Sequence, residues 1–265
     1  MTPIPIAAVA GAVGFLSRVP VGHSDARWDA FRGTPAAIPV AGYPIGALLA
    51  LPLAAVALAP GGIGAAVPTE TVAVVFVAWL YTVTGITHLD GVADLGDAAV
   101  VHGDADRRRE VLKDSSLGVG GVLALALVVL GLAAAAALVA GLARFAPLAA
   151  VGLVIGTEVA AKAATAALVC VGEAPHEGLG SALTAESGVH SLVWVGVLTA
   201  PVVLVGWPAL TPGIAVVGAA ALAAAAALWW ARNRLGGVSG DVLGATNEIA
   251  RVVGLHVGVV AWTLS

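Results

Sequence analysis

"GVGGVLALALVVLGLAAAAALVAGL", residues 118–142, contains no charged side chain. A helix needs about 20 mostly apolar residues to cross the hydrocarbon core of a bilayer. This stretch therefore predicts a membrane-spanning helix, and similar runs fill most of the remaining chain. We expect about seven spans, at approximately 36–59, 71–87, 118–142, 146–170, 190–207, 211–231 and 250–264.

The composition leads to the same class of protein. Of the 265 residues, 60% are hydrophobic and 11% are charged, and the mean hydropathy is +1.01. Soluble proteins carry about 25% charged residues, so this chain has too few charges to cover an aqueous surface. Unbroken apolar runs also differ from the alternating segments of a membrane β-barrel. We predict an all-α, polytopic membrane bundle with one domain over 1–265, in contact with membrane lipid.

The basic residues sort the loops into two groups. Arginines precede the first expected span, follow the second and flank 232–249, whereas the loop 60–70 has no basic residue. By the positive-inside rule, we expect the N-terminal segment 1–35 and the loops 88–117, 171–189 and 232–249 to face the cytoplasm across the plasma membrane. Whether residues 2–16 cross or re-enter the membrane stays open. The net charge of −4 gives no basic field for nucleic acid.

The loop after the second expected span contains "HLDGVADLGDA", residues 88–98. If this stretch is helical, Asp90, Asp94 and Asp97 lie on one stripe, because successive helical residues are about 100° apart. Three adjacent carboxylates repel one another, and a divalent cation removes that repulsion. Mg²⁺ prefers oxygen ligands and commonly shares carboxylates with substrate phosphates. The alternative is a solvated acidic loop, which is what we expect for Asp104 and Asp106.

A second motif, "KDSSLGVGG", spans residues 113–121. Ser115 or Ser116 is a candidate cap for the following helix, whose free N–H groups near Gly118 would suit a phosphate. Lys113 is either a phosphate contact or part of the positive-inside bias. Asp114 either completes a metal shell or caps the helix.

Three further polar features stand out. "GGVSGDVLGATNEIAR", residues 236–251, places Asp241 and Glu248 two helical turns apart and therefore on one face. The alternative for Ser239 or Asp241 is that it starts the last helix. Arg18 is either an interfacial anchor or a guanidinium that binds phosphate. Glu158 and Lys162, spaced i,i+4 inside an apolar run, are expected to pair.

Carboxylates at the mouth of a helical bundle favour one chemistry. Metal ions there would bridge phosphate oxygens and help an alcohol to attack phosphorus. An amphipathic substrate would explain the location in a membrane. The residues therefore indicate Mg²⁺-dependent transfer from a nucleotide-activated donor to an alcohol.

The chain resembles the cobalamin synthase family (adenosylcobinamide-GDP ribazoletransferase), itself distantly similar to CDP-alcohol phosphotransferases. The matching motifs, in family order, are "FLSRVPV" (15–21), "PVAGYPIGALLA" (39–50), "TGITHLDGVADLGDA" (84–98), "RRREVLKDSSLGVGG" (107–121), "EGLGSAL" (177–183) and "GGVSGDVLGATNEI" (236–249). Arg251 stands where members often carry an acid.

The resemblance implies a reaction and a set of roles. Adenosylcobinamide-GDP would be the donor and α-ribazole or its 5′-phosphate the acceptor, giving adenosylcobalamin or its 5′-phosphate and GMP with Mg²⁺ as cofactor. Asp90, Asp94 and Asp97 would hold metal, and Asp94, Asp97 and Asp114 would be catalytic. The implied substrate-binding residues are Arg18, His88, Lys113, Ser115, Gly118, Asp241 and Glu248.

Two other functions stay open from the residues alone. A CDP-alcohol phospholipid synthase would use the same chemistry, but its signature requires a Gly directly after Asp94-x-x-Asp97, where this chain has Ala98. An ion-coupled transporter would need carboxylates near mid-membrane, and only Glu158 and Lys162 lie well inside a span. The sequence does not give the number of metal ions, the catalytic base or the oligomeric state.

Overall fold

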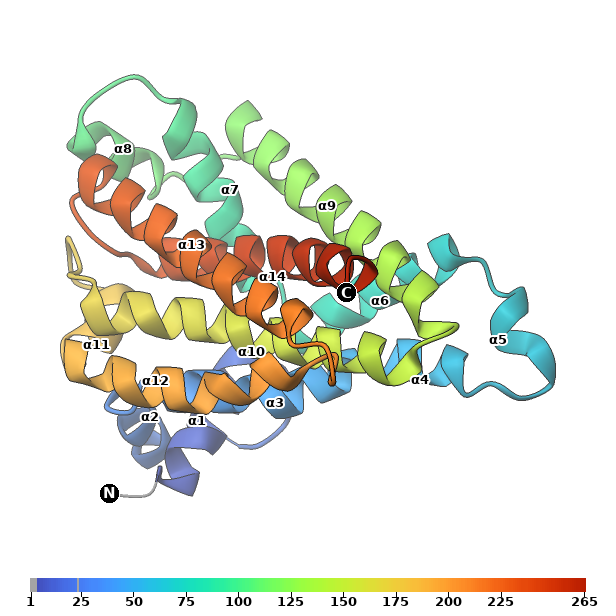
Figure 1. The fold of residues 1–265 in the computed structure, drawn as a ribbon. Helices are drawn as coiled ribbons and strands as arrows, with labels where there is room; N and C mark the ends of the chain where they lie inside the picture. Colours follow the sequence, from blue (N-terminus) through green and yellow to red (C-terminus); the bar gives the residue numbers. More distant parts are fainter. Residues whose placement is uncertain (1–3, 23) are drawn as a thin grey trace.

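The structure is a computed structural model that describes residues 4–22 and 24–265, and within them every regular element is a helix. Residues 1–3 of the expected N-terminal segment lie outside this part. The elements, drawn in Figure 1, are α1 (Ile6–Leu16), α2 (Asp25–Arg32), α3 (Ala37–Leu49), α4 (Leu51–Ala57), η1 (Pro60–Gly62), α5 (Ile63–Ala66), α6 (Thr69–Thr84), α7 (Thr87–Val100), α8 (Ala105–Val111), α9 (Val119–Ala143), α10 (Pro147–Val171), α11 (Leu179–Thr184), η2 (Val189–Ser191), α12 (Leu192–Thr199), η3 (Ala200–Leu204), α13 (Thr211–Arg234) and α14 (Gly240–Thr263).

Helix α10 is the centre of the bundle and contacts α3, α9, α13 and α14. Apart from Glu158, Lys162 and its threonines it is apolar, as expected for a helix surrounded by others, and 78% of its apolar window is buried. Only 22% of the corresponding window of α9 is buried, and Leu123, Leu127 and Leu130 on α9 are exposed. Because such leucines are costly in water, the outer face of α9 fits a lipid environment.

The number of spans differs from the expected seven. Within the described residues, four helices are long and apolar enough to cross a membrane, or five if the bent pair α6 and α7 forms one span. The expected span 190–207 is divided into η2, α12 and η3, with Pro201 in the first turn of η3. The expected span 250–264 is the second half of α14, whose first half carries Asp241 and Glu248. At 11 residues, α1 is too short to cross a bilayer.

The bend between α6 and α7 positions the acidic motif. Helix α6 ends at Thr84, and Gly85 has φ +77°, a conformation that glycine adopts without a steric penalty. Helix α7 then departs at 100° to α6 and packs against α9 and α14. Residues 88–98, which the sequence places in a loop and predicts as a helix only conditionally, are helical and form most of α7.

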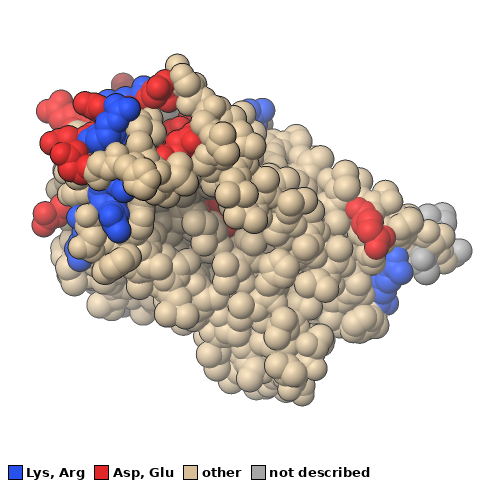
Figure 2. All heavy atoms as spheres, turned by 90° about the horizontal axis from the view of Figure 1, so that it is seen from above, with Lys and Arg blue, Asp and Glu red and all other residues tan. Residues whose placement is uncertain are grey.

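Charged side chains gather over one end of the molecule (Figure 2). In Figure 1 this end holds α2, α8 and α11, together with the last turn of α13. The predicted sorting of polar loops to one end is therefore confirmed, whereas the cytoplasmic orientation of that end stays a prediction.

Candidate active site

Two of the three motif aspartates line a cavity beside α7. Asp90 and Asp94 of α7 line this cavity of about 500 Å³, together with Ser115 and Ser116 from the segment before α9. The remaining walls are mostly apolar: Ile86, Leu89, Ala93, Leu117 and Leu125. Because Asp90 and Asp94 are four residues apart on α7, both carboxylates lie on the same side of the helix. We call this space the aspartate cavity.

The surroundings of Asp94 disfavour the negatively charged form of its carboxylate. Its pKa is raised to about 6 by partial burial and then by the negative charges of Asp90, Asp241 and Asp97. Asp241 belongs to α14, so the structure brings the late motif next to the early one. A cation placed among these groups would lower their mutual repulsion.

Asp241 reaches this position through close contact of two helices. A Cβ atom on Gly91 of α7 would lie 2.7 Å from the carbonyl oxygen of Asp241, so only glycine permits this approach. Ser239 caps α14, as predicted, because its hydroxyl accepts the N–H of Val242 at 3.4 Å. The same hydroxyl donates to Oδ2 of Asp241 at 3.1 Å and so orients that carboxylate.

Asp97, for which the resemblance implies metal-binding and catalytic roles, accepts hydrogen bonds from backbone groups at the start of α9. Its Oδ2 accepts the N–H of Gly118 at 2.8 Å and its Oδ1 accepts the N–H of Gly121 at 2.9 Å. A carboxylate from α7 thus caps the N-terminus of α9. The partial positive charge at a helix N-terminus stabilises a negatively charged group placed there. The prediction that Ser115 or Ser116 caps this helix is wrong. The amide of Gly118, expected to bind phosphate, is already occupied by Asp97.

Glu248 also lies away from the aspartate cavity. It is 1% exposed and belongs to a network that spans α6, α7, α10 and α14. His88 Nδ1 lies 3.4 Å from its Oε1, the Tyr81 hydroxyl donates to its Oε2 at 3.3 Å, and Arg251 pairs with it. Although Glu248 is two turns from Asp241, its contacts are structural ones, and the geometry does not favour the predicted direct contact with substrate.

The predicted pairing of Glu158 with Lys162 is confirmed at 3.1 Å. Arg251 also contacts Glu158, with Nε 2.8 Å from Oε2. Lys162 Nζ donates to Asn247 Oδ1 at 2.8 Å. Sequence reasoning missed Arg251 as a partner because the two residues lie on different helices, 93 positions apart.

The remaining predicted residues surround the aspartate cavity without lining it. Arg18 is exposed, and its Nε lies 3.2 Å from where a Cβ of Gly85 would stand, beside the bend that precedes the cavity. Lys113 is exposed and has no ion pair with any described carboxylate. Asp114 accepts the N–H of Ser116 at 2.9 Å, and hydrogen bonds from Ser116 lower its pKa. Asp114 is thus a turn residue here.

His88 faces a second cavity, of about 390 Å³, on the other side of the first turn of α7. Thr87 lines both cavities. His176, on the loop before α11, also lines this second space, together with Asp241 and Ser239. No local pattern in the sequence indicates this cavity, because its walls come from α1, α2, α3, α7, α10, α11 and α14.

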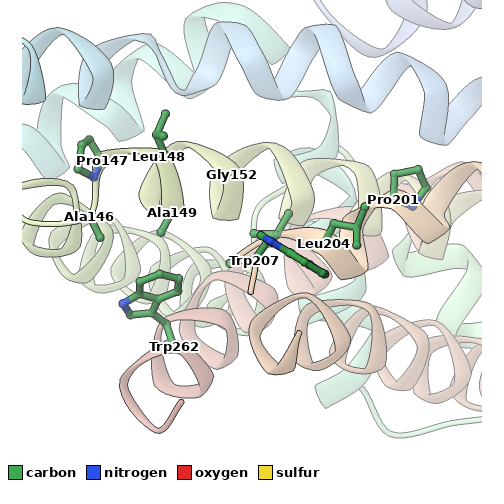
Figure 3. A pocket seen from close by; sticks show the side chains of 11 residues that line it. Ala146, Pro147, Leu148, Ala149, Gly152, Pro201, Leu204, Trp207 and Trp262 are labelled. Carbon is green, nitrogen blue, oxygen red and sulfur yellow. The ribbon is translucent and has the colours of Figure 1, made fainter. Parts of the chain in front are cut away.

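A third cavity, of about 600 Å³, has a different character (Figure 3). It lies where α10 begins and α14 ends, and Pro147, Leu148, Trp207 and Trp262 are among its lining residues. Among the residues that the structure describes, no titratable side chain lines it. It therefore lacks groups for acid–base or metal chemistry, and the aspartate cavity is the candidate active site.

Comparison with known proteins identifies the family. The model of the family described as cobalamin-5-phosphate synthase matches residues 8–259. The chain belongs to the cobalamin-5-phosphate synthase family. A relative from Halorubrum lacusprofundi, named adenosylcobinamide-GDP ribazoletransferase, is 56% identical over 97% of this chain and 98% of its own length. Relatives of the same name from Haloquadratum walsbyi and Methanocella arvoryzae are 47% and 33% identical, over 98% and 95% of this chain and 99% and 95% of their own lengths.

No solved structure matches the chain, so the distant likeness to CDP-alcohol phosphotransferases stays a prediction. The family match covers nearly the whole chain. It therefore includes α7, α9 and the part of α14 that carries Asp241.

The donor set of the cavity fits Mg²⁺ chemically. Among residues 4–22 and 24–265, no three His, Cys, Asp or Glu side chains stand close enough together to hold a metal ion by themselves. Mg²⁺ in enzymes is usually held by one or two carboxylates, with water and substrate phosphates completing the shell. Asp90 and Asp94 offer that smaller set on one helical face, with the carboxylate of Asp241 nearby.

Proposed function

We propose that this chain joins adenosylcobinamide-GDP to α-ribazole or to α-ribazole 5′-phosphate, with release of GMP. The observation that carries the proposal is the pair Asp90 and Asp94 in one cavity with two serine hydroxyls, near Asp241. The name of these relatives supports the identity of the two substrates. The same name supports classing the chain as a transferase of cobalamin synthesis.

The aspartate cavity suits the diphosphate of the donor. Asp90 and Asp94 would hold Mg²⁺, which when bound neutralises charge on phosphate oxygens. The hydroxyls of Ser115 and Ser116 would donate hydrogen bonds to the same phosphates. Arg18 and Lys113, exposed at the edge and without carboxylate partners among the described residues, would attract the anionic donor from solution.

The bond changes follow from the substrates. The acceptor hydroxyl attacks the phosphorus attached to cobinamide and loses its proton. The bond between that phosphorus and the oxygen of GMP breaks, and GMP leaves with the electron pair. The protein's contribution is to orient these groups in line, because positioning and charge stabilisation supply most of the catalysis in phosphoryl transfer.

A membrane location suits such a site. The apolar walls of the aspartate cavity, including Ile86, Leu89 and Leu125, would contact the large amphipathic corrinoid part of the donor. We place the bundle across the plasma membrane with its charged end facing the cytoplasm, because basic residues concentrate at that end.

The test is formation of GMP by the purified chain in lipid nanodiscs. With Mg²⁺, adenosylcobinamide-GDP and α-ribazole, we expect GMP and a cobalamin product in equal amounts, and none after the metal is chelated. Asp94→Asn should lower kcat by about 10²-fold or more, the range expected when a charge-stabilising group is lost. Asp106→Asn, on the exposed face of α8 at the same end of the molecule, is the matched control. A fully active Asp94→Asn variant would contradict the assignment of the site.

A further inference from the structure

We propose that the 390 Å³ cavity beside His88 is the acceptor subsite and holds the benzimidazole base of α-ribazole. This inference rests on the proposed function and adds to it the place where the smaller substrate binds. The volume lies within the range of small-ligand pockets. A corrinoid with its ring of amide side chains is far larger than this space, whereas a nucleoside fits it.

Several lining residues of the cavity are aromatic or aliphatic. Phe15 and Phe31 line it, with their ring centroids 5.4 Å apart. Trp28 packs on both, at 5.5 Å from Phe15 and 5.8 Å from Phe31, and so makes this wall rigid. Leu179 and Leu183 of α11 complete the apolar lining. Such walls suit a flat heteroaromatic base that carries methyl groups.

Polar residues also line the cavity, and we call them its polar side. Asp241 and Ser239 from the start of α14, His88 from α7 and His176 from the loop before α11 all line it. His88 is fixed because its Nδ1 lies 3.4 Å from buried Glu248, which leaves the other ring nitrogen for a ligand. These groups can accept or donate hydrogen bonds to ribose hydroxyls, so the sugar would lie on this side and the base against the phenylalanines.

The position of the cavity connects it with the chemistry. Thr87 lines both this cavity and the aspartate cavity, and the carboxylate of Asp241 is close enough to influence Asp94. A sugar held at the polar side would therefore face the phosphates of the donor across the first turn of α7. The guanine of the donor is the competing occupant, but its several exocyclic and ring polar groups would find few partners among the apolar walls.

The experiment measures binding of α-ribazole to the full chain in nanodiscs by calorimetry, without Mg²⁺ and without donor. Leu179→Trp places a larger side chain at the cavity wall, and His176→Ala removes a polar group from an exposed loop position. We expect each change to weaken α-ribazole binding by about tenfold, a difference of about 1.4 kcal/mol. His190→Ala, an exposed histidine at η2 that lines none of the cavities described above, should bind as the unchanged chain does.

Steady-state kinetics separates the two proposals. The acceptor subsite predicts a raised KM for α-ribazole in Leu179→Trp and His176→Ala, with the KM for adenosylcobinamide-GDP within twofold of the unchanged chain. Asp94→Asn should keep its affinity for α-ribazole while losing turnover. A raised KM for the donor alone, or displacement of α-ribazole from this cavity by GMP, would overturn the acceptor assignment. Absence of GMP formation by the unchanged chain, with α-ribazole still bound, would overturn the proposed function alone.

Discussion

At the scale of single residues, the three motif aspartates divide into two groups. Asp90 and Asp94 line the aspartate cavity, whereas both oxygens of Asp97 accept N–H groups at the start of α9. The sequence predicts the stripe correctly, because 3.6-residue periodicity is a local property. It does not predict the division, because the amides that bind Asp97 come from residues 21 and 24 positions later.

Asp97→Ala should therefore destabilise the protein rather than alter its need for metal. Loss of a helix cap costs about 1–2 kcal/mol. The backbone amides of Gly118 and Gly121 would have to form hydrogen bonds with water instead. We expect a lower midpoint of thermal unfolding in detergent for Asp97→Ala, together with an unchanged Mg²⁺ concentration at half-maximal rate. Asp94→Asn should show the reverse, with unfolding little changed and a higher Mg²⁺ requirement. A raised Mg²⁺ requirement in Asp97→Ala would instead make Asp97 a metal ligand.

At the scale of helices, the apolar runs predict α9, α10 and α13 to within about three residues at each end, because a long hydrophobic stretch has no alternative in a membrane. The same reasoning fails for α14, which begins at Gly240. Its polar first half resembles a loop in sequence, yet Glu248 and Arg251 are buried against α6, α7 and α10. The charged residues in a sequence indicate a polar segment, but they do not identify the oppositely charged partner that compensates each buried charge.

The junction between α10 and α14 makes a prediction at this scale. Glu158, Lys162, Glu248 and Arg251 form a buried set with two positive and two negative groups. Removal of one member leaves an unpaired buried charge, which costs about 3–5 kcal/mol. Glu158→Gln and Lys162→Met should each lower the unfolding midpoint strongly. The double variant keeps the Glu248–Arg251 pair and restores neutrality, so it should lose less than the sum of the two. Additive losses in this double-mutant cycle would show that charge balance is not what stabilises the junction.

At the scale of the whole molecule, the fold places its chemistry and its charges at the same end. Helices α2, α8 and α11 and the start of α14 all lie there, as do the two polar cavities, while the apolar cavity of Figure 3 lies where α10 begins. Loop charge predicts this arrangement from sequence because the positive-inside rule depends on how Lys and Arg are distributed among the loops. The sequence does not predict the cavities, because their walls come from helices that lie far apart in the chain.

The orientation of the bundle in the membrane can be tested with two single-cysteine variants. Cys170 is buried, and Cys170→Ala provides a background without thiols, since the chain has one cysteine. Glu110→Cys on α8 and Glu70→Cys on α6 each replace an exposed glutamate, at the charged and the opposite end respectively. In intact cells a thiol reagent that does not cross membranes should label position 70 and leave position 110 unlabelled until the cells are opened, because positively charged loops are retained in the cytoplasm. The reverse pattern would place the aspartate cavity outside the cell, away from nucleotide-activated donors, and both positions labelled together would mean that the bundle does not separate its two ends across the bilayer.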